Sequence, residues 1–122
     1  MGAVGSVAGR VTEGPLLDDE TGETTFVLAL EARVIEAGPP AHVVDGEAEW
    51  CEVTCAADLA QNVADSLVVG DRVFAAGEFI ASVVGGVEGG VHVLMRLRAT
   101  TVGQDLRYKV ARLITRSAPP HG

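Results

Sequence analysis

The stretch EWCEVTCAADLAQNVADSLVVGDRVFAAGEF, residues 49–79, decides the fold of this chain of 122 residues. Its first part, residues 49–55, has the composition of a strand and carries the only tryptophan, Trp50. In residues 57–67 apolar side chains recur every three to four positions, which predicts a helix of about three turns with one apolar face. Gly70 suits the left-handed conformation found after helices, and residues 72–79 return to extended structure.

The remaining apolar patterns are those of strands. Residues 4–11 alternate loosely and are expected to end at Gly14-Pro15, while residues 24–34 and 91–99 alternate more clearly. In these two strands the predicted inward side chains are Phe26, Leu28, Leu30 and Ala32, and then Val93, Met95, Leu97 and Ala99. One short helix between the third and fourth strands of an all-β chain is typical of the OB-fold, a five-stranded Greek-key barrel.

The chain is long enough for one domain, which we place at residues 1–116, followed by a disordered tail at 117–122. Residues 105–116 are expected to form a short turn and then either a terminal strand or an arm. No run of 18 apolar residues is present, and the first residues do not have the pattern of a secretory signal. We therefore expect a cytoplasmic protein.

The side chains that commonly bind metals or perform catalysis show no suitable grouping. Cys51 and Cys55 share one face of a strand but lie ~13 Å apart, too far for a disulfide, and are expected to be buried thiols. The three histidines lack the spacing of metal ligands. The carboxylates are not placed with a His or Ser at the spacing of a nucleophilic site. The sequence thus predicts no metal, no cofactor and no enzymatic activity.

The distribution of charge leaves two interpretations open. The net charge is −8, which opposes binding to nucleic acid, because such binding depends on basic groups that displace counterions. Residues 1–88 hold three basic and sixteen acidic groups, whereas residues 89–122 hold six basic groups and one acidic group. The arginines either form a local positive groove or pair with acidic side chains from other strands.

Several motifs resemble those of bacterial single-stranded DNA-binding proteins. They are Glu49-Trp50, LAQNVADSL at 59–67, GDRV at 70–73 and Gly77. Residues 9–16, GRVTEGPL, resemble the opening of that family, and residues 102–108, VGQDLRY, resemble the close of the domain in actinobacterial members. The resemblance implies an OB-fold, sequence-independent binding of single-stranded DNA in replication, recombination or repair, a nucleoid-associated location, and a homotetramer whose barrels pair edge to edge.

The resemblance also suggests the residues of the site. Trp50 stands where the family places an aromatic side chain that stacks on bases, although a lone Trp can equally fill the core. The candidates for contacts to the DNA backbone are Arg10, Arg33, Arg72, Arg96 and Arg98.

Other positions depart from the family. Val34, Ala56 and Val84 replace aromatic residues, the usually basic hairpin is glycine-rich with Glu88, and the acidic tail ending in Phe is missing. The alternative function is therefore an oligomeric protein-interaction module that has lost most of its DNA affinity.

Overall fold

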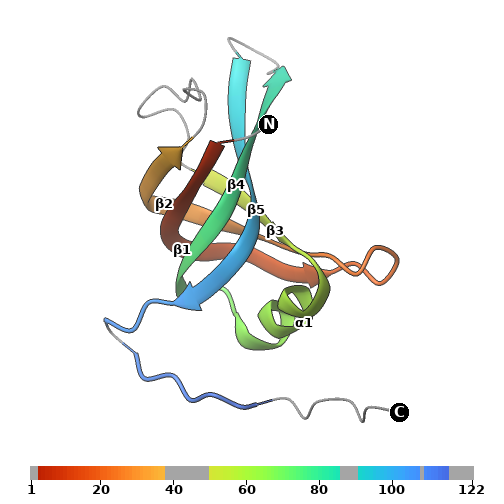
Figure 1. The fold of residues 1–122 in the computed structure, drawn as a ribbon, viewed down its shortest axis with the longest axis vertical. Helices are drawn as coiled ribbons and strands as arrows, with labels where there is room; N and C mark the ends of the chain where they lie inside the picture. Colours follow the sequence, from red (N-terminus) through yellow and green to blue (C-terminus); the bar gives the residue numbers. More distant parts are fainter. Residues whose placement is uncertain (1–2, 38–49, 86–90, 108, 116–122) are drawn as a thin grey trace.

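Five alternating segments form strands in the structure, a computed structural model that describes residues 3–37, 50–85, 91–107 and 109–115 (Figure 1). The elements, in chain order, are β1 (Ala3–Leu17), β2 (Thr24–Ala37), β3 (Trp50–Cys55), α1 (Ala57–Ser66), β4 (Arg72–Gly85) and β5 (Val91–Gln104). The strands close into a barrel in the order β1-β2-β3-β5-β4, and β4 returns to β1. All pairs are antiparallel except β3 with β5. The predicted five-stranded barrel with a helix between the third and fourth strands is confirmed.

The core consists of the inward side chains of the strands together with one face of α1. The predicted inward residues Phe26, Leu28, Met95 and Leu97 are at most 2 % exposed, and Leu30 packs against this core. The helix buries Ala60 and Val63, followed by Leu67, as its apolar spacing predicts. Burial of a Val, Leu or Phe side chain contributes ~1.5–3 kcal/mol. The barrel is therefore held together mainly by aliphatic side chains.

Four strands are longer than the sequence predicts: β1, β2, which continues to Ala37, β4, which continues to Gly85, and β5. β1 does not end at Gly14-Pro15 but continues to Leu17, because register shifts on both sides of Glu13 let the strand keep its pairing with β2. Gly14 takes a φ of 83°, which is available to glycine at little cost. β5 continues to Gln104 alongside β4. Beyond it, residues 105–107 and 109–115 form no strand, so of the two expected alternatives the structure has an arm.

The turn between α1 and β4 is tied to β1 and to the arm. The helix ends at Ser66, and Gly70 takes its positive φ, 99°, in the turn rather than at the helix cap. The Gly70 N–H donates to the carbonyl of Val11 over 2.8 Å. The carboxylate of Asp71 accepts hydrogen bonds from the Val68 N–H at 3.0 Å and from Lys109 Nζ at 2.9 Å. Burial alone would raise the pKa of Asp71, but these two donors hold its pKa below the usual value.

Both cysteines face the core as free thiols, as expected. Burial raises the pKa of Cys51 to about 12, with a smaller effect from Glu52, and raises the pKa of Cys55 to about 11. The described residues hold no group of three or more His, Cys, Asp or Glu that suits a metal ion. No helix in the described ranges is long and apolar enough to cross a membrane.

A methyl group at Gly77 should destabilise the barrel. A Cβ there would overlap the carbonyl oxygen of Arg98 and lie 2.8 Å from the Cα of Ala99, so the β4–β5 pair would have to shift. We expect Gly77→Ala to lower the free energy of unfolding by about 1–3 kcal/mol in urea titrations. Gly103→Ala is the matched control, because no atom lies within 4 Å of its added Cβ. Equal stabilities of the two variants would contradict this packing.

The thiols should be inert in the folded protein. A raised pKa leaves almost no thiolate at pH 8, and the thiolate is the reactive form. We expect Ellman's reagent to modify Cys51 and Cys55 only after denaturation, while a cysteine introduced as Val69→Cys, at a position 62 % exposed, reacts at once. Rapid modification of both native thiols would show that the inward face of β3 is wrongly assigned.

Candidate nucleic-acid interface

Trp50 lies on the outside of the barrel. It begins β3, whose next residues alternate so that Cys51, Val53 and Cys55 point into the core. Because successive side chains of a strand point to opposite faces, Trp50 points outward. Its side chain is 49 % exposed. Of the two placements that the sequence left open, the structure has the indole on the surface.

Trp50 is in register with two arginines on neighbouring strands. It pairs with Ala29 on β2, Ala29 pairs with Arg10 on β1, and Arg10 pairs with Arg72 on β4. Directly paired residues share a face of the sheet. These four residues, here called the Trp50 row, cross four strands and span ~14 Å at ~4.8 Å per strand. An extended strand of nucleic acid that follows the row would meet first an aromatic face and then cations.

The two arginines of the Trp50 row differ in their surroundings. Arg10 is exposed and makes no ion pair with a described side chain. Arg72 Nη1 lies 2.9 Å from Glu31 Oε2, and both side chains are about 40 % exposed, at 38 % and 41 %. Exposed pairs of this kind are worth ~0–1 kcal/mol, so a phosphate can replace Glu31 at little cost.

Two more predicted arginines lie on the other side of Trp50, on β5. Arg96 is beside Glu52 of β3, and its Nε lies 3.5 Å from Glu52 Oε1. Arg98 is in register with Thr54 on one side and Glu78 on the other, and it forms no ion pair among the described side chains. Both arginines are exposed. Cations therefore flank the indole from two sides. Of these four arginines, Arg72 and Arg96 are paired with glutamates.

Arg33, the fifth predicted arginine, lies in β2, where its backbone pairs with Val7 of β1. Its side chain lies outside the described part of the structure, as do residues 86–90 of the glycine-rich hairpin and the predicted tail. The structure therefore brings Arg10 and Arg72 into line with Trp50, places Arg96 and Arg98 across β5, and leaves Arg33 as a prediction.

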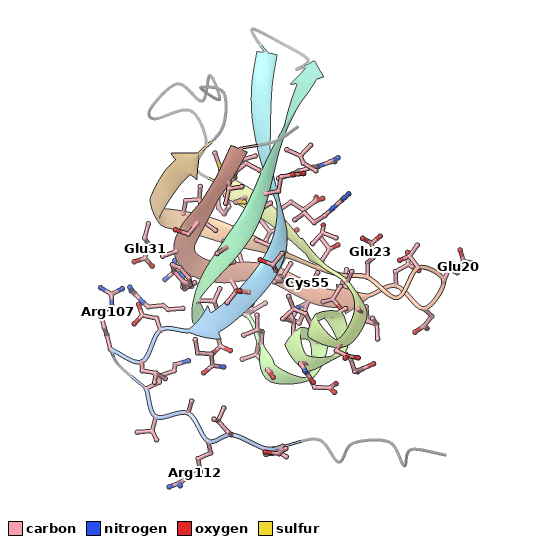
Figure 2. All side chains as sticks on the ribbon, in the orientation of Figure 1. Glu20, Glu23, Glu31, Cys55, Arg107 and Arg112 are labelled. Atoms are coloured by element: carbon pink, nitrogen blue, oxygen red, sulfur yellow. The ribbon has the colours of Figure 1, made fainter. Side chains whose placement is uncertain are left out.

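An acidic turn limits the interface at one end of the barrel. Residues 18–23 connect β1 to β2, and the exposed acidic side chains of this turn are Asp18, Asp19 and Glu20, with Glu23 half-buried. The turn adjoins Thr24, which pairs with Cys55, five residues along β3 from Trp50. That separation is ~16 Å. Figure 2 shows Glu20 and Glu23 on this turn, on the opposite side of the barrel from Glu31. These carboxylates, which form no ion pair with a described side chain, repel phosphate from that end of the barrel, whereas the two described glutamates near Trp50, Glu31 and Glu52, are each paired with an arginine.

Sequence reasoning missed the acidic partners and one apolar face. The alternation of β2 and β3 indicated that Glu31 and Glu52 face outward, but the partner strand of each was not readable from the sequence. Phe74 is 46 % exposed and points outward from β4 in register with Ala8 of β1. In the sequence, the alternation of β4 was the signal that could have predicted this: Phe74 lies between Val73 and Ala75, which are both buried, so it must face outward.

Comparisons with known proteins identify the fold. No protein-family model matches the chain, and no curated protein sequence does. Solved structures do match. The small single-stranded DNA-binding protein of Streptomyces coelicolor has a TM-score of 0.62 and 24 % identity over 86 % of this chain and 95 % of that one.

Two further structures are similar. The second single-stranded DNA-binding protein of Mycobacterium smegmatis has a TM-score of 0.67 at 22 % identity, over 95 % of this chain and 99 % of that one. The mitochondrial single-stranded DNA-binding protein Rim1 of S. cerevisiae has a TM-score of 0.52 at 12 % identity, over 85 % and 94 %. With the closed barrel and the placement of α1, these likenesses show that the chain has the OB-fold.

Proposed function

We propose that the chain is a divergent member of the bacterial single-stranded DNA-binding family, and that it binds single-stranded DNA without sequence preference and without catalysis. The observation that supports this most is the exposed indole of Trp50 in register with Arg10 on the outer wall of an OB barrel. The faces of strands 2 and 3 commonly bind oligonucleotides in this fold. The similarity to three single-stranded DNA-binding structures supports the same function.

The expected affinity follows from two contributions. Stacking of a base on an aromatic side chain is worth ~1–3 kcal/mol and does not depend on the base. Each phosphate neutralised adds ~0.7 to the slope of log affinity against log salt for single strands. The site has one indole, two cations that form no ion pair with a described side chain, and two cations that must exchange a glutamate for a phosphate. Binding is therefore expected to be strong only at low salt. From such binding we propose that the protein acts in DNA replication, recombination or repair. We also propose that it lies in the cytoplasm, at the nucleoid.

A second function is favoured by the acidic turn and by the pairing of Arg72 and Arg96 with glutamates. These features suit an oligomeric OB-fold module that binds protein and has little DNA affinity. The two functions differ in a single measurable property, the low-salt affinity for an oligonucleotide.

Substitutions in the Trp50 row should weaken DNA binding in different ways. Trp50→Ala is expected to lower the affinity for a labelled oligo(dT) by about tenfold, because the stacking contact is lost, and Trp50→Phe should restore part of it. Arg10→Gln is expected to reduce the salt slope by about 0.7, and Arg10→Lys should leave it unchanged. Fluorescence anisotropy between 20 and about 200 mM salt measures both quantities.

Val69→Ser serves as the control, since Val69 is exposed but lies outside the row. If the unsubstituted protein does not bind the oligonucleotide at the lowest salt, the DNA-binding function is wrong and the interaction module remains. If it binds and Trp50→Ala binds equally well, the DNA follows another path.

We propose in addition that the protein is a homotetramer, with an apolar sheet face as one of its contacts. The outward side chains of β1 and β4 in this face are Val4, Ser6, Ala8, Phe74 and Ala76, with the half-buried Glu78 in register with Val4 at its edge. Val4 and Phe74 are 50 % and 46 % exposed. Small side chains around one aromatic ring form a flat surface, which suits a contact with the same surface of another copy.

A charge at the centre of this face should separate the copies. Phe74→Glu is expected to reduce the mass measured by light scattering from four times 12.6 kDa to a smaller assembly, because each symmetric contact would bury two unpaired carboxylates. Val69→Glu adds the same charge at another exposed apolar position and should leave the mass unchanged. A monomeric unsubstituted protein would contradict the proposal.

A further inference from the structure

The Trp50 row is continued by the first residue after β5. The N–H of Asp105 donates to the carbonyl of Arg72 over 2.8 Å, one residue beyond the end of the pairing of β4 with β5. Asp105 therefore lies next to Arg72, at the point where the chain leaves β5 and becomes the arm, residues 105–107 and 109–115. Measured across the strands, Asp105 is ~19 Å from Trp50, at ~4.8 Å per strand.

Asp105 holds the side chain of Arg107 in place. Its Oδ2 accepts a hydrogen bond from Arg107 Nε over 2.8 Å and lies 2.6 Å from Nη2, and its Oδ1 accepts one from the Arg107 N–H over 3.0 Å. These bonds, and to a smaller extent the nearby charge of Arg72, hold the pKa of Asp105 below its usual value, so the pair is charged at neutral pH. The side chain of Arg107 is nevertheless 60 % exposed.

Arg107 lies on the side of the barrel that carries the arginines of the Trp50 row. Figure 2 shows Arg107 on the same side as Glu31, the partner of Arg72, and opposite the acidic turn with Glu20. Arg10, Arg72 and Arg107 thus follow one another on β1, β4 and the arm. A polyanion that leaves the row beyond Arg72 meets Arg107 next.

The other two cations in the described part of the arm are less suited to such a contact. Lys109 is paired with Asp71 over 2.9 Å, and Asp71 is 6 % exposed, so a phosphate that took Lys109 would leave a buried carboxylate without its charge partner. The pair of Arg107 with Asp105 is more open to solvent, and such pairs exchange partners at little cost. Arg112 lies five residues farther along the arm.

We propose that Arg107 is a further contact to the DNA backbone, and that a strand bound on the Trp50 row continues past Arg72 to the base of the arm. Asp105 takes two of the five N–H donors of the guanidinium, and the phosphate takes others. The base of the arm thereby lengthens the path of the DNA on one copy of the chain. This inference rests on the proposed function, because it needs a strand on the row.

Neutralising Arg107 tests the contact in the full chain. Arg107→Gln is expected to reduce the slope of log affinity for labelled oligo(dT) against log salt by about 0.7. Its deficit in affinity relative to the unsubstituted protein should therefore shrink about 2.5-fold between roughly 50 and 200 mM salt. Arg107→Lys should keep the slope, because the charge remains. Arg112→Gln is the matched control, since it removes the same charge farther along the arm and should leave the slope unchanged.

A second measurement locates the contact. In the isotope-labelled chain, the NMR signal of the Arg107 Nε–H group, assigned by its loss in Arg107→Gln, should shift as oligo(dT) is added at low salt. The corresponding signal of Arg112 should stay in place. The emission of Trp50 in the free Arg107→Gln variant should match that of the unsubstituted protein, because the barrel is intact.

The outcomes separate this inference from the function on which it rests. An unsubstituted protein that does not bind at low salt would overturn both. Binding that depends on Trp50 but keeps its full salt slope in Arg107→Gln would overturn the inference alone. An equal loss of slope in Arg112→Gln would show diffuse attraction by the arm in place of a contact. A slope in Arg107→Lys as low as in Arg107→Gln would assign Arg107 to holding the arm, and either result contradicts the proposal.

Discussion

The closed barrel imposes a strict alternation on its strands, and every functional feature of the molecule depends on it. In β3 the inward positions are filled by Cys51, Val53 and Cys55, which are at most 1 % exposed. A slip of one residue would bring Trp50 into the core and expose these three side chains. Pairing of β3 with both β2 and β5 fixes the register, so the core packing itself places the indole on the outer wall.

The same register explains how an acidic protein can present a local site for an anion. Electrostatic interactions between exposed charges are screened beyond ~10 Å at moderate salt. The acidic turn is ~16 Å along β3 from Trp50, whereas Arg10 lies two strands away in the same row. The net charge of −8 therefore lowers the affinity for all nucleic acid without abolishing the local attraction of the row.

Much of the architecture was readable from the sequence because alternation and helical spacing are local properties. The inward faces of β2 and β5 and the buried face of α1 were predicted correctly for the side chains that the structure describes, while Ala32 and Val93 lie outside these. The end of β1 was not predicted correctly, because the register shifts near Gly14 depend on the pairing of β1 with β2. Whether Trp50 was buried could not be decided, since it is the first residue of its strand and its neighbours in the barrel are distant in sequence. For the same reason the sequence did not show that Glu31 pairs with Arg72 and Glu52 with Arg96.

The accessibility of the single tryptophan tests the central claim most directly. If the indole forms the outer wall, the free protein should show the red-shifted emission of a solvated indole, and acrylamide should quench it efficiently. Saturating oligo(dT) at low salt should then quench the emission and reduce the access of acrylamide. A blue-shifted emission that acrylamide does not reach would show that Trp50 is in the core. An exposed indole that is indifferent to the oligonucleotide would leave the barrel intact and contradict its proposed function.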